Sequence, residues 1–453
     1  MNEKLFGTEK ISKILLKIAP PVMFAQLIQA LYNIVDSIFV GRYSETGLTA
    51  LSIIFPIQLL MIAIATGTGV GINTSMSYSL GLDNKEKAEQ TAGTAAPIAL
   101  VLWFIFALIS WWFIPFYARI STNSQAVIDD VIAYGRITCI FSIGLFLESC
   151  WTKVHQAYGN MKTPMIAQIV GAIINIVLDP ILIFGLIGMP KLGVTGAAIA
   201  TVVGQIVAAI IVMIKGVRKS PNIKLYPKEL ARIYQLGLPN IIMQAAYTFY
   251  IFGLNIILKG FSDQAVTALG VYYKWQTFFF IPLGSLQTCI VPILSYNYAS
   301  NNMDRCKKTL NTSLLYGMGL MFLGTLCFEF LPAQMMRVFS SDPDVISIGT
   351  WGFRFIGISF IPQVTSLIYP VFFQAVDQPI KSSLLTFVRT LFLFVPLGYI
   401  FSRFGLKYFW LTYPVTETIT SIIGYILYRK FLKKKELDEK AKENKNAENI
   451  MLN

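Results

Sequence analysis

The stretch that decides the fold is residues 14–40, ILLKIAPPVMFAQLIQALYNIVDSIFV. Its length and apolar composition suit a helix that crosses a lipid bilayer, which needs about 20 such residues. Asp36 interrupts the run near its end, and a carboxylate in a bilayer costs roughly 2.5 to 3.5 kcal/mol on insertion scales. Such a residue usually faces a bundle interior or a wet cavity, where it handles ions, protons or substrate.

The composition indicates that the rest of the chain is also suited to a membrane. The 453 residues are 55% hydrophobic and only 13% charged, about half the charged share of an average soluble domain. The mean hydropathy is +0.60. Further apolar runs of bilayer length predict an all-α integral membrane protein with twelve transmembrane helices. The predicted spans are centred near Ala30, Ala63, Leu102, Phe141, Ile174, Val203, Tyr247, Leu283, Met321, Phe360, Leu393 and Ile422.

Basic residues gather in alternate connections between these spans, within residues 4–17, 215–232, 305–308 and 429–435. Because basic loops stay on the cytoplasmic side, we expect a multi-pass protein with both termini in the cytoplasm. The net charge of +13 follows from this topology, so membrane lipids are expected as partners and nucleic acid is not. The five cysteines have no CxxC spacing, which argues against a metal site or a disulfide framework.

The two halves of the chain repeat in a constant register. Pro21 falls on Pro239, and the same shift places Tyr32 on Tyr250 and Gln156 on Gln374 without any gap between them. Each copy holds six predicted spans, an even number, so both copies enter the membrane the same way. The sequence therefore predicts two six-helix lobes related by a pseudo-twofold axis along the membrane normal.

The repeat fixes the predicted domain boundaries. The first lobe covers residues 1–215 and contains the coupling site, and the second covers residues 233–432. A basic cytoplasmic linker at 216–232 joins them, and a charged cytoplasmic tail occupies 433–453. Transporters built from such repeats place their site between or within the bundles and alternate access by rocking them.

Polar residues form a stripe on the first span. Gln26, Gln29, Asn33 and Asp36 step by three, four and three residues, which places them on one side of a helix. Tyr32 lies one turn before Asp36. Helix rise places Asp36 roughly 9 Å below the outer end of this span.

The fifth span carries a matching stripe. Gln168, Asn175 and Asp179 step by seven and four residues, and Asp179 lies roughly 18 Å below Lys191 in the outer half of the membrane. A pocket shared by both acids is therefore plausible, and Thr201 of span six and Asn73 of span two could complete it.

These acids are absent from the second copy. In the register of the repeat, Asp36 maps to Leu254 and Asp179 maps to Leu397. If the acids served only to lock helices together, the fold would need them twice. We therefore expect a specialised site in the first lobe, while helix locking by hydrogen bonds to Asn or Tyr stays the simpler alternative.

Buried carboxylates favour the uptake of a proton or a cation. Burial disfavours the charged form of an acid, and a second acid nearby disfavours it further. The coupling group is thus predicted as Asp36, Asp179, Asn175, Tyr32, Asn33 and Thr201, with H+ or Na+ as the coupling ion and no other cofactor. Pro20 and Pro21 are expected to act as a hinge, because proline frees a backbone carbonyl within a helix.

Several further residues are candidates for lining a substrate cavity. Lys274, Arg389 and Glu417 fall within second-lobe spans, where they could pair, line a cavity or snorkel to the interface. The full set of candidates is Gln26, Gln29, Asn73, Gln168, Tyr247, Lys274, Arg389 and Glu417. Glu148, near the cytoplasmic end of span four, is expected at the membrane interface instead.

Catalytic motifs such as a P-loop, HExxH or GxSxG are absent from the sequence. We therefore expect a secondary antiporter rather than an ATPase or another enzyme.

Three motifs carry a resemblance to a known family. They are the run Tyr32-Asn33-Ile34-Val35-Asp36, the turn sequence from Gln156 to Pro164, and Asn175-Ile176-Val177-Leu178-Asp179-Pro180. With them, residues 10–430 resemble the multidrug and toxic compound extrusion (MATE) family, in its bacterial MepA-like or DinF-like branch.

The resemblance implies a V-shaped pair of lobes that exports organic cations and drugs in exchange for H+ or Na+. It implies coupling through Asp36, Asn175 and Asp179, with Thr201 nearby. The chain departs from some relatives in having Tyr158 where they carry a glutamate. Another branch places coupling acids in the second lobe, and Tyr247 and its neighbours offer none.

The expected protein is a monomeric multidrug exporter of the bacterial cytoplasmic membrane. A lipid-linked or polysaccharide flippase of the same superfamily shape is the nearest alternative, and it would be expected to show a more cationic cavity and often extra spans. An integral-membrane enzyme or a receptor is more remote, because the chain shows neither a reactive constellation nor another reason for a twofold repeat.

Overall fold

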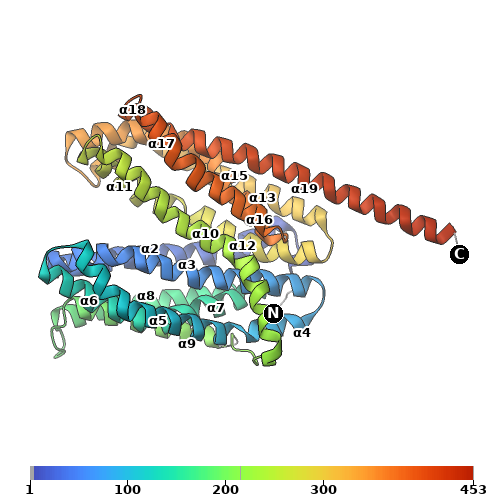
Figure 1. The fold of residues 1–453 in the computed structure, drawn as a ribbon, viewed down its shortest axis with the longest axis horizontal. Helices are drawn as coiled ribbons and strands as arrows, with labels where there is room; N and C mark the ends of the chain where they lie inside the picture. Colours follow the sequence, from blue (N-terminus) through green and yellow to red (C-terminus); the bar gives the residue numbers. More distant parts are fainter. Residues whose placement is uncertain (1–4, 215, 452–453) are drawn as a thin grey trace.

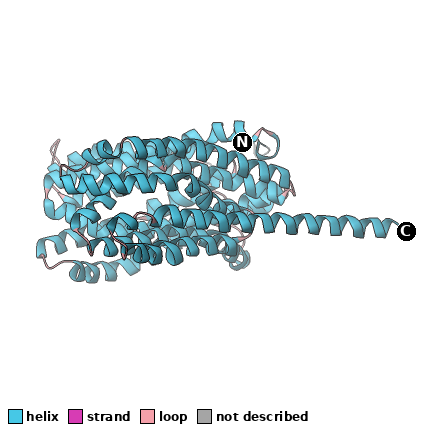
Figure 2. Ribbon diagram, turned by 90° about the horizontal axis from the view of Figure 1, so that it is seen from above, coloured by secondary structure: helices cyan, strands magenta, loops and turns pink. Residues whose placement is uncertain are grey.

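The computed structural model describes residues 5–214 and 216–451, and within these ranges the regular structure is helical (Figures 1 and 2). Lys4 and Lys215, which belong to the basic segments of the predicted topology, lie outside the described residues. The first half contains α1 (Leu5–Thr8), α2 (Ile11–Tyr43), α3 (Glu45–Gly81), α4 (Lys85–Gly93), α5 (Ala95–Ser121), α6 (Gln125–Ile140), α7 (Ile143–Ala157), α8 (Lys162–Phe184) and α9 (Val194–Met213).

The second half begins with a 3-10 turn, η1, and includes a π-helical segment, η2. Its elements are η1 (Ile223–Leu225), α10 (Tyr226–Lys259), α11 (Asp263–Phe279), α12 (Ile281–Ala299), α13 (Met303–Phe330), α14 (Pro332–Arg337), α15 (Pro343–Ala375), α16 (Pro379–Phe387), η2 (Val388–Phe394), α17 (Val395–Ser402), α18 (Leu406–Phe409) and α19 (Thr412–Met451).

Two bundles make up the molecule, α2 to α9 in the first lobe and α10 to α19 in the second. They lie against each other near the end that carries both chain termini, called here the terminal end, and diverge toward the opposite, distal end (Figure 1). The predicted V-shaped, two-lobed fold is confirmed. The last part of α19 projects beyond the bundle at the terminal end (Figures 1 and 2).

The repeat is visible in the helix boundaries. The shift that carries Pro21 onto Pro239 moves α3 onto 263–299, the combined extent of α11 and α12. It also moves α6 with α7 onto 343–375, the extent of α15. Each pair thus matches one unbroken helix with one bent helix.

The bends in the repeated helices differ in place and cause. The α6–α7 bend is 41° and the α11–α12 bend is 49°. Pro282 at the start of α12 cannot continue the hydrogen bonding of α11, which explains the second bend.

Nine helices among the described residues are long and apolar enough to span a bilayer, or eleven if each bent pair counts as one span. The twelfth predicted span corresponds to the first part of α19, where Glu417 and several Thr and Tyr side chains dilute the apolar run. On α5, Phe104, Leu108, Trp112 and Phe116 are all exposed at four-residue spacing, and Trp112 is 76% exposed. Such a stripe is typical of a lipid-facing helix surface.

Helices α2 and α10 each pack partly in the opposite lobe. Ile14 and Ile18 of α2 belong to the core of the second lobe, whereas Asp36 farther along α2 lies in the first lobe, where α2 packs on α8. Likewise, Ile233 of α10 belongs to a core of the first lobe, and Leu254 belongs to that of the second. Each helix therefore connects the two lobes.

Prolines lie where these helices pass from one lobe to the other. Pro20 and Pro21 fall within α2, which continues through them as one helix, and Pro239 falls at the equivalent place in α10. A proline removes one intrahelical hydrogen bond and lowers the resistance of a helix to bending. The predicted hinge at Pro20 and Pro21 thus has a counterpart in α10.

Close helix packing joins the lobes in their terminal half. A Cβ atom added at Gly71 of α3 would lie 2.1 Å from the carbonyl oxygen of Ile233, and one at Gly237 of α10 would lie 2.4 Å from that of Gly67. Small residues allow such backbone contact between membrane helices. Because the contacts involve backbone atoms, larger residues could fit only if α3 and α10 moved apart.

We predict that Gly71→Ala separates the lobes at the terminal end. Overpacking of this kind costs about 1–3 kcal/mol, enough to change a conformational equilibrium by roughly five- to 150-fold. Spin labels on Lys87→Cys and Lys308→Cys, two exposed positions on different lobes, should show a longer distance distribution. Gly270→Ala is the matched control, because nothing lies within 4 Å of its added Cβ. An unchanged distribution in Gly71→Ala would contradict this account of the contact.

Candidate functional site

Four of the predicted coupling residues meet inside the distal half of the first lobe. Asp36 comes from α2, Asn175 and Asp179 come from α8, and Thr201 comes from α9. They are buried, with exposed fractions of 7% for Asp36 and 0% for Asp179. The two carboxylates are close enough to interact electrostatically.

Hydrogen bonds within this group are few and long. The Asn175 side-chain nitrogen donates to Asp179 Oδ1 at 3.4 Å and to Thr201 Oγ1 at 3.5 Å. Among the described side chains, Asp36 Oδ1, Asn175 Oδ1 and Asp179 Oδ2 are buried acceptors without a hydrogen-bond partner. Buried acceptors without donors are costly. Hydrogen-bond donors and hard cations are the partners that such oxygen atoms accept.

The depth predicted for Asp179 is corrected by the end of its helix. α8 stops at Phe184, and Gly185 caps it in the left-handed conformation, so the count to Lys191 includes a loop. Helix rise places Asp179 roughly 8 Å from the end of α8 and Asp36 roughly 10 Å from the end of α2. The two acids therefore lie at similar depths.

Asn33 is the one predicted coupling residue that the structure places elsewhere. Its side chain is exposed, although Asp36 one turn later is buried. At about 100° per residue, Gln29 and Asp36 lie roughly 20° apart around the helix, whereas Asn33 lies roughly 60° away from Asp36. The stripe is therefore narrower than the residue spacing suggested.

Two tyrosines border the acids. Tyr32 interacts electrostatically with both Asp36 and Asp179 and lies close to Gln29. Tyr134 of α6, which sequence reasoning did not identify, lies beside Asp36 and close to Thr201. Nothing in the sequence of α6 alone marks this tyrosine, because only the tertiary packing of α6 on α3, α5 and α9 brings it close to Asp36.

A central cavity of about 460 Å³ lies between the lobes, and its wall is rich in amides and hydroxyls. Of the predicted substrate-lining residues, Gln26, Gln29, Asn73 and Gln168 line it. Glu148 and Lys153 of α7 supply its charged side chains among the described residues. The complete polar wall consists of Gln26, Gln29, Thr66, Asn73, Glu148, Ser149, Thr152, Lys153, Gln156, Gln168, Asn240, Gln244, Gln287, Thr288 and Gln374.

Glu148 is the main residue that sequence reasoning misplaces, at the membrane interface. It accepts hydrogen bonds from Thr152 at 2.8 Å and from Gln168 at 3.2 Å. The sequence does carry a signal, since Glu148 is an acid within a predicted span. The span centre at Phe141 hides this signal, because the helix bends there and α7 continues to Ala157.

A second, smaller cavity lies beside the coupling residues and shares part of its wall with the central one. It has a volume of about 80 Å³, and its lining includes Tyr32, Asn175 and Thr201 together with Glu148 and Gln168. Glu148 and Gln168 also line the central cavity. A continuous series of polar side chains therefore leads from the buried acids to the space between the lobes.

With this geometry established, comparison with known proteins identifies the family. The family model described as MatE matches residues 21–181 and residues 239–400, two segments whose first residues, Pro21 and Pro239, are equivalent in the repeat. This chain belongs to the MatE family.

Relatives of this MatE protein are similar over nearly their whole length. The multidrug export protein MepA of Staphylococcus haemolyticus is 24% identical, covering 94% of this chain and 96% of MepA. A protein of Shewanella oneidensis named FAD transporter is 23% identical, covering 92% of this chain and 94% of its own. A solved outward-facing structure of a multidrug resistance MATE transporter has a TM-score of 0.88 at 21% identity, covering 96% and 98% of the two chains.

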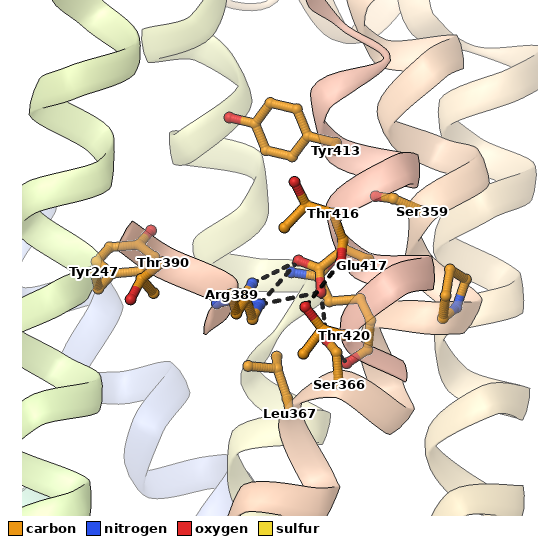
Figure 3. A network of polar contacts seen from close by, with 12 residues as sticks. Tyr247, Ser359, Ser366, Leu367, Arg389, Thr390, Tyr413, Thr416, Glu417 and Thr420 are labelled. Carbon is orange, nitrogen blue, oxygen red and sulfur yellow. Dashed lines mark hydrogen bonds and ion pairs between the residues drawn. The ribbon is translucent and has the colours of Figure 1, made fainter. Parts of the chain in front are cut away.

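The second lobe of this MatE protein has its own buried charges. Arg389 lies in η2 and pairs with Glu417 of α19, its Nη2 donating to Oε1 at 2.6 Å and its Nε to Oε2 at 3.0 Å (Figure 3). Ser366 of α15 also donates to Glu417. The sequence around Tyr247 contains no acid, as predicted. The fold nevertheless brings an acid of another helix, Glu417 of α19, into this region of the second lobe.

The remaining candidates for lining a substrate cavity differ in where the structure places them. Tyr247 and Arg389 line a third cavity of about 220 Å³. Glu417 is fully buried behind Arg389. Lys274 is exposed, with its ammonium 4.9 Å from the centre of the Phe339 ring, so the structure places it away from these cavities. Of the alternatives left open for Lys274 by the sequence, this position agrees with a side chain that reaches the surface.

We predict that Asp179→Leu, which copies the second-lobe residue Leu397, raises thermal stability. Removing a buried acceptor without a donor should add about 1–3 kcal/mol, provided that leucine fits the site. The measurement is the melting temperature of the purified protein in detergent, with Asp304→Asn as an exposed control. If Asp179 instead held helices together through hydrogen bonds, Asp179→Leu would melt at a lower temperature.

Proposed function

We propose that this chain is a secondary transporter that exports positively charged organic compounds in exchange for H+ or Na+. The observation that carries the proposal is the group of three buried acceptor oxygens on Asp36, Asn175 and Asp179 that have no donor. A proton or Na+ supplies the missing partner. The site is thus built to load and release a cation rather than to stabilise the fold.

The route between the cavities supports coupling between ion and substrate. Glu148 and Gln168 line both the small cavity beside the coupling residues and the central cavity. A positive substrate beside Glu148 and a cation at the two aspartates repel each other through a low-dielectric region. Each therefore weakens the binding of the other, which is the linkage that antiport requires.

The shape of the central cavity supports an organic substrate. Its volume of about 460 Å³ is in the range of small-molecule sites. Amide side chains from both lobes surround it, and amides accept and donate hydrogen bonds with many partners. The MepA relative, named as a multidrug export protein, agrees with a broad range of substrates.

Alternating access follows from the way α2 and α10 join the lobes. In the described state α3 and α10 are packed together in the terminal half. Bending at Pro20, Pro21 and Pro239 would let each lobe rotate without unfolding either helix. Loading of the acids in α2 and α8 would then bias this equilibrium, because α2 belongs to both lobes.

The orientation is inferred from charge. Basic residues lie in the connections and helix starts at the terminal end, including Arg218, Arg232 and Arg305, so we place this end and both termini in the cytoplasm. The contact between α3 and α10 then closes the cytoplasmic side. We place the protein in a bacterial cytoplasmic membrane, as a monomer surrounded by lipid.

A flippase of the same superfamily is the competing function. It would need a strongly basic cavity for a phosphorylated lipid carrier. The central cavity instead combines one acid, Glu148, with one base, Lys153, among its described residues. This balance favours export of small organic molecules.

We predict that Asp36→Asn abolishes gradient-driven export. Vesicles that contain the protein should expel ethidium when either a proton or a sodium gradient is imposed, and the active gradient names the ion. The variant should lose at least about tenfold in rate, a loss within the range of typical coupling energies. Asp304→Asn, an exposed acid with 96% side-chain exposure, should transport normally. A fully active Asp36→Asn, or wild-type protein that ignores both gradients, would overturn the proposal.

A further inference from the structure

The third cavity has an arginine in its wall that the export of cations does not use. It lies between the lobes, with Leu59 contributed by α3 and Gln244 by α10, and Arg389 is its charged side chain among the described residues. It shares Gln244 and Gln287 with the central cavity. The two cavities are therefore neighbours, separated by side chains that line both.

Part of the Arg389 guanidinium is hydrogen-bonded to protein, and another part is not. Its Nε and Nη2 bond to Glu417, and none of the hydrogen bonds among the described residues uses Nη1. Because the residue lines the cavity, Nη1 is the nitrogen available to a ligand (Figure 3). A guanidinium has five N–H donors in a flat fork and can bind two carboxylates by different edges.

A second polar group in the same wall also lacks a partner. Gln363 of α15 is 1% exposed, and its Oε1 is buried without a hydrogen-bond partner among the described residues. It lines the cavity with Arg389, Tyr247 and Phe280. The wall thus offers a charged donor, a free amide oxygen and two aromatic rings.

Packing alone does not explain the buried ion pair. In the register of the repeat Arg389 corresponds to Gly171, where α8 and α9 touch so closely that an added Cβ would lie 2.7 Å from the Gly204 oxygen. The second lobe separates the equivalent helices by a charged side chain instead. Apolar residues usually fill such space with equal or better stability. The π-helical turn that carries Arg389, favoured here by Pro396, is a feature often found at functional sites.

We propose that Arg389 binds the carboxylate of aromatic, zwitterionic substrates in this cavity. The positive part of the same molecule lies toward Glu148 in the central cavity, and its ring lies beside Tyr247 and Phe280. Glu417 and Ser366 act as positioning residues that hold the guanidinium in place. This inference rests on the proposed export function and adds a substrate class to it.

Two dyes that differ only at the carboxylate test the inference. Rhodamine 110 is a zwitterion with a free carboxylate, and rhodamine 123 is its methyl ester. Equilibrium binding to the purified protein is measured by fluorescence anisotropy, without any gradient. We expect Arg389→Gln to weaken rhodamine 110 by about tenfold or more, the usual effect of losing a charged hydrogen bond, and rhodamine 123 by less than about twofold.

Further variants separate binding from folding. Arg389→Gln leaves Glu417 buried without its partner, so the double variant Arg389→Gln with Glu417→Gln removes both charges together. It should show the same selective loss. Glu417→Gln alone keeps the guanidinium and leaves it an amide oxygen as acceptor, so this variant should still bind rhodamine 110 in preference to rhodamine 123. Arg403→Gln, which removes an exposed arginine of the same lobe, should change neither dye.

Equal losses for the two dyes in the double variant, or no loss in either, would overturn the inference. In that case the ion pair only joins helices. The dye test uses no gradient and does not involve Asp36. If the protein binds rhodamine 110 selectively but does not expel ethidium, the carboxylate site is supported and only the proposed export function is contradicted.

Discussion

Two carboxylates buried in an apolar bundle without enough donors are the constraint on which this molecule depends. Asp36 Oδ1 and Asp179 Oδ2 both lack a partner among the described residues, and Asn175 Oδ1 beside them does too. A fold selected only for stability would satisfy or remove such atoms. In the proposed function a cation binds these atoms for part of the transport cycle, and its binding supplies free energy for moving the lobes.

The repeat shows how one fold carries two different polar centres. The first lobe has its acids on α2 and α8, and the second has Arg389 and Glu417 on the segments equivalent to α8 and α9. The first lobe packs Gly171 against Gly204 and leaves its acids without a base, whereas the second inserts Arg389 and neutralises it with Glu417. In the proposed function the first centre exchanges a cation, whereas the second is an ion pair whose guanidinium lines the third cavity. Because α2 and α10 each pack in both lobes, a change at either centre can reach the interface.

The fold and the centre of the coupling site could be predicted because their signals are local. Apolar length identified the spans, the constant register revealed the repeat, and Asp36 and Asp179 stood out as acids in apolar helices. Residues that depend on helix rotation or on tertiary contacts were less accessible. Asn33 shares the spacing of Asp36 but points to another side of α2, and Tyr134 reaches Asp36 only because α6 packs on α3 and α9. The bend at Phe141 hid the position of Glu148, and the partner of Arg389 lies 28 positions away on another helix.

The central claim is that cation binding at Asp36 and Asp179 competes with substrate binding in the central cavity. The most direct measurement is the equilibrium affinity of the purified protein for ethidium as proton and sodium concentrations are varied independently. Linkage predicts that the affinity falls by about fivefold or more as the coupling ion increases. It also predicts that the double variant Asp36→Asn with Asp179→Asn loses this dependence. A wild-type affinity that stays constant under both ions would contradict the account.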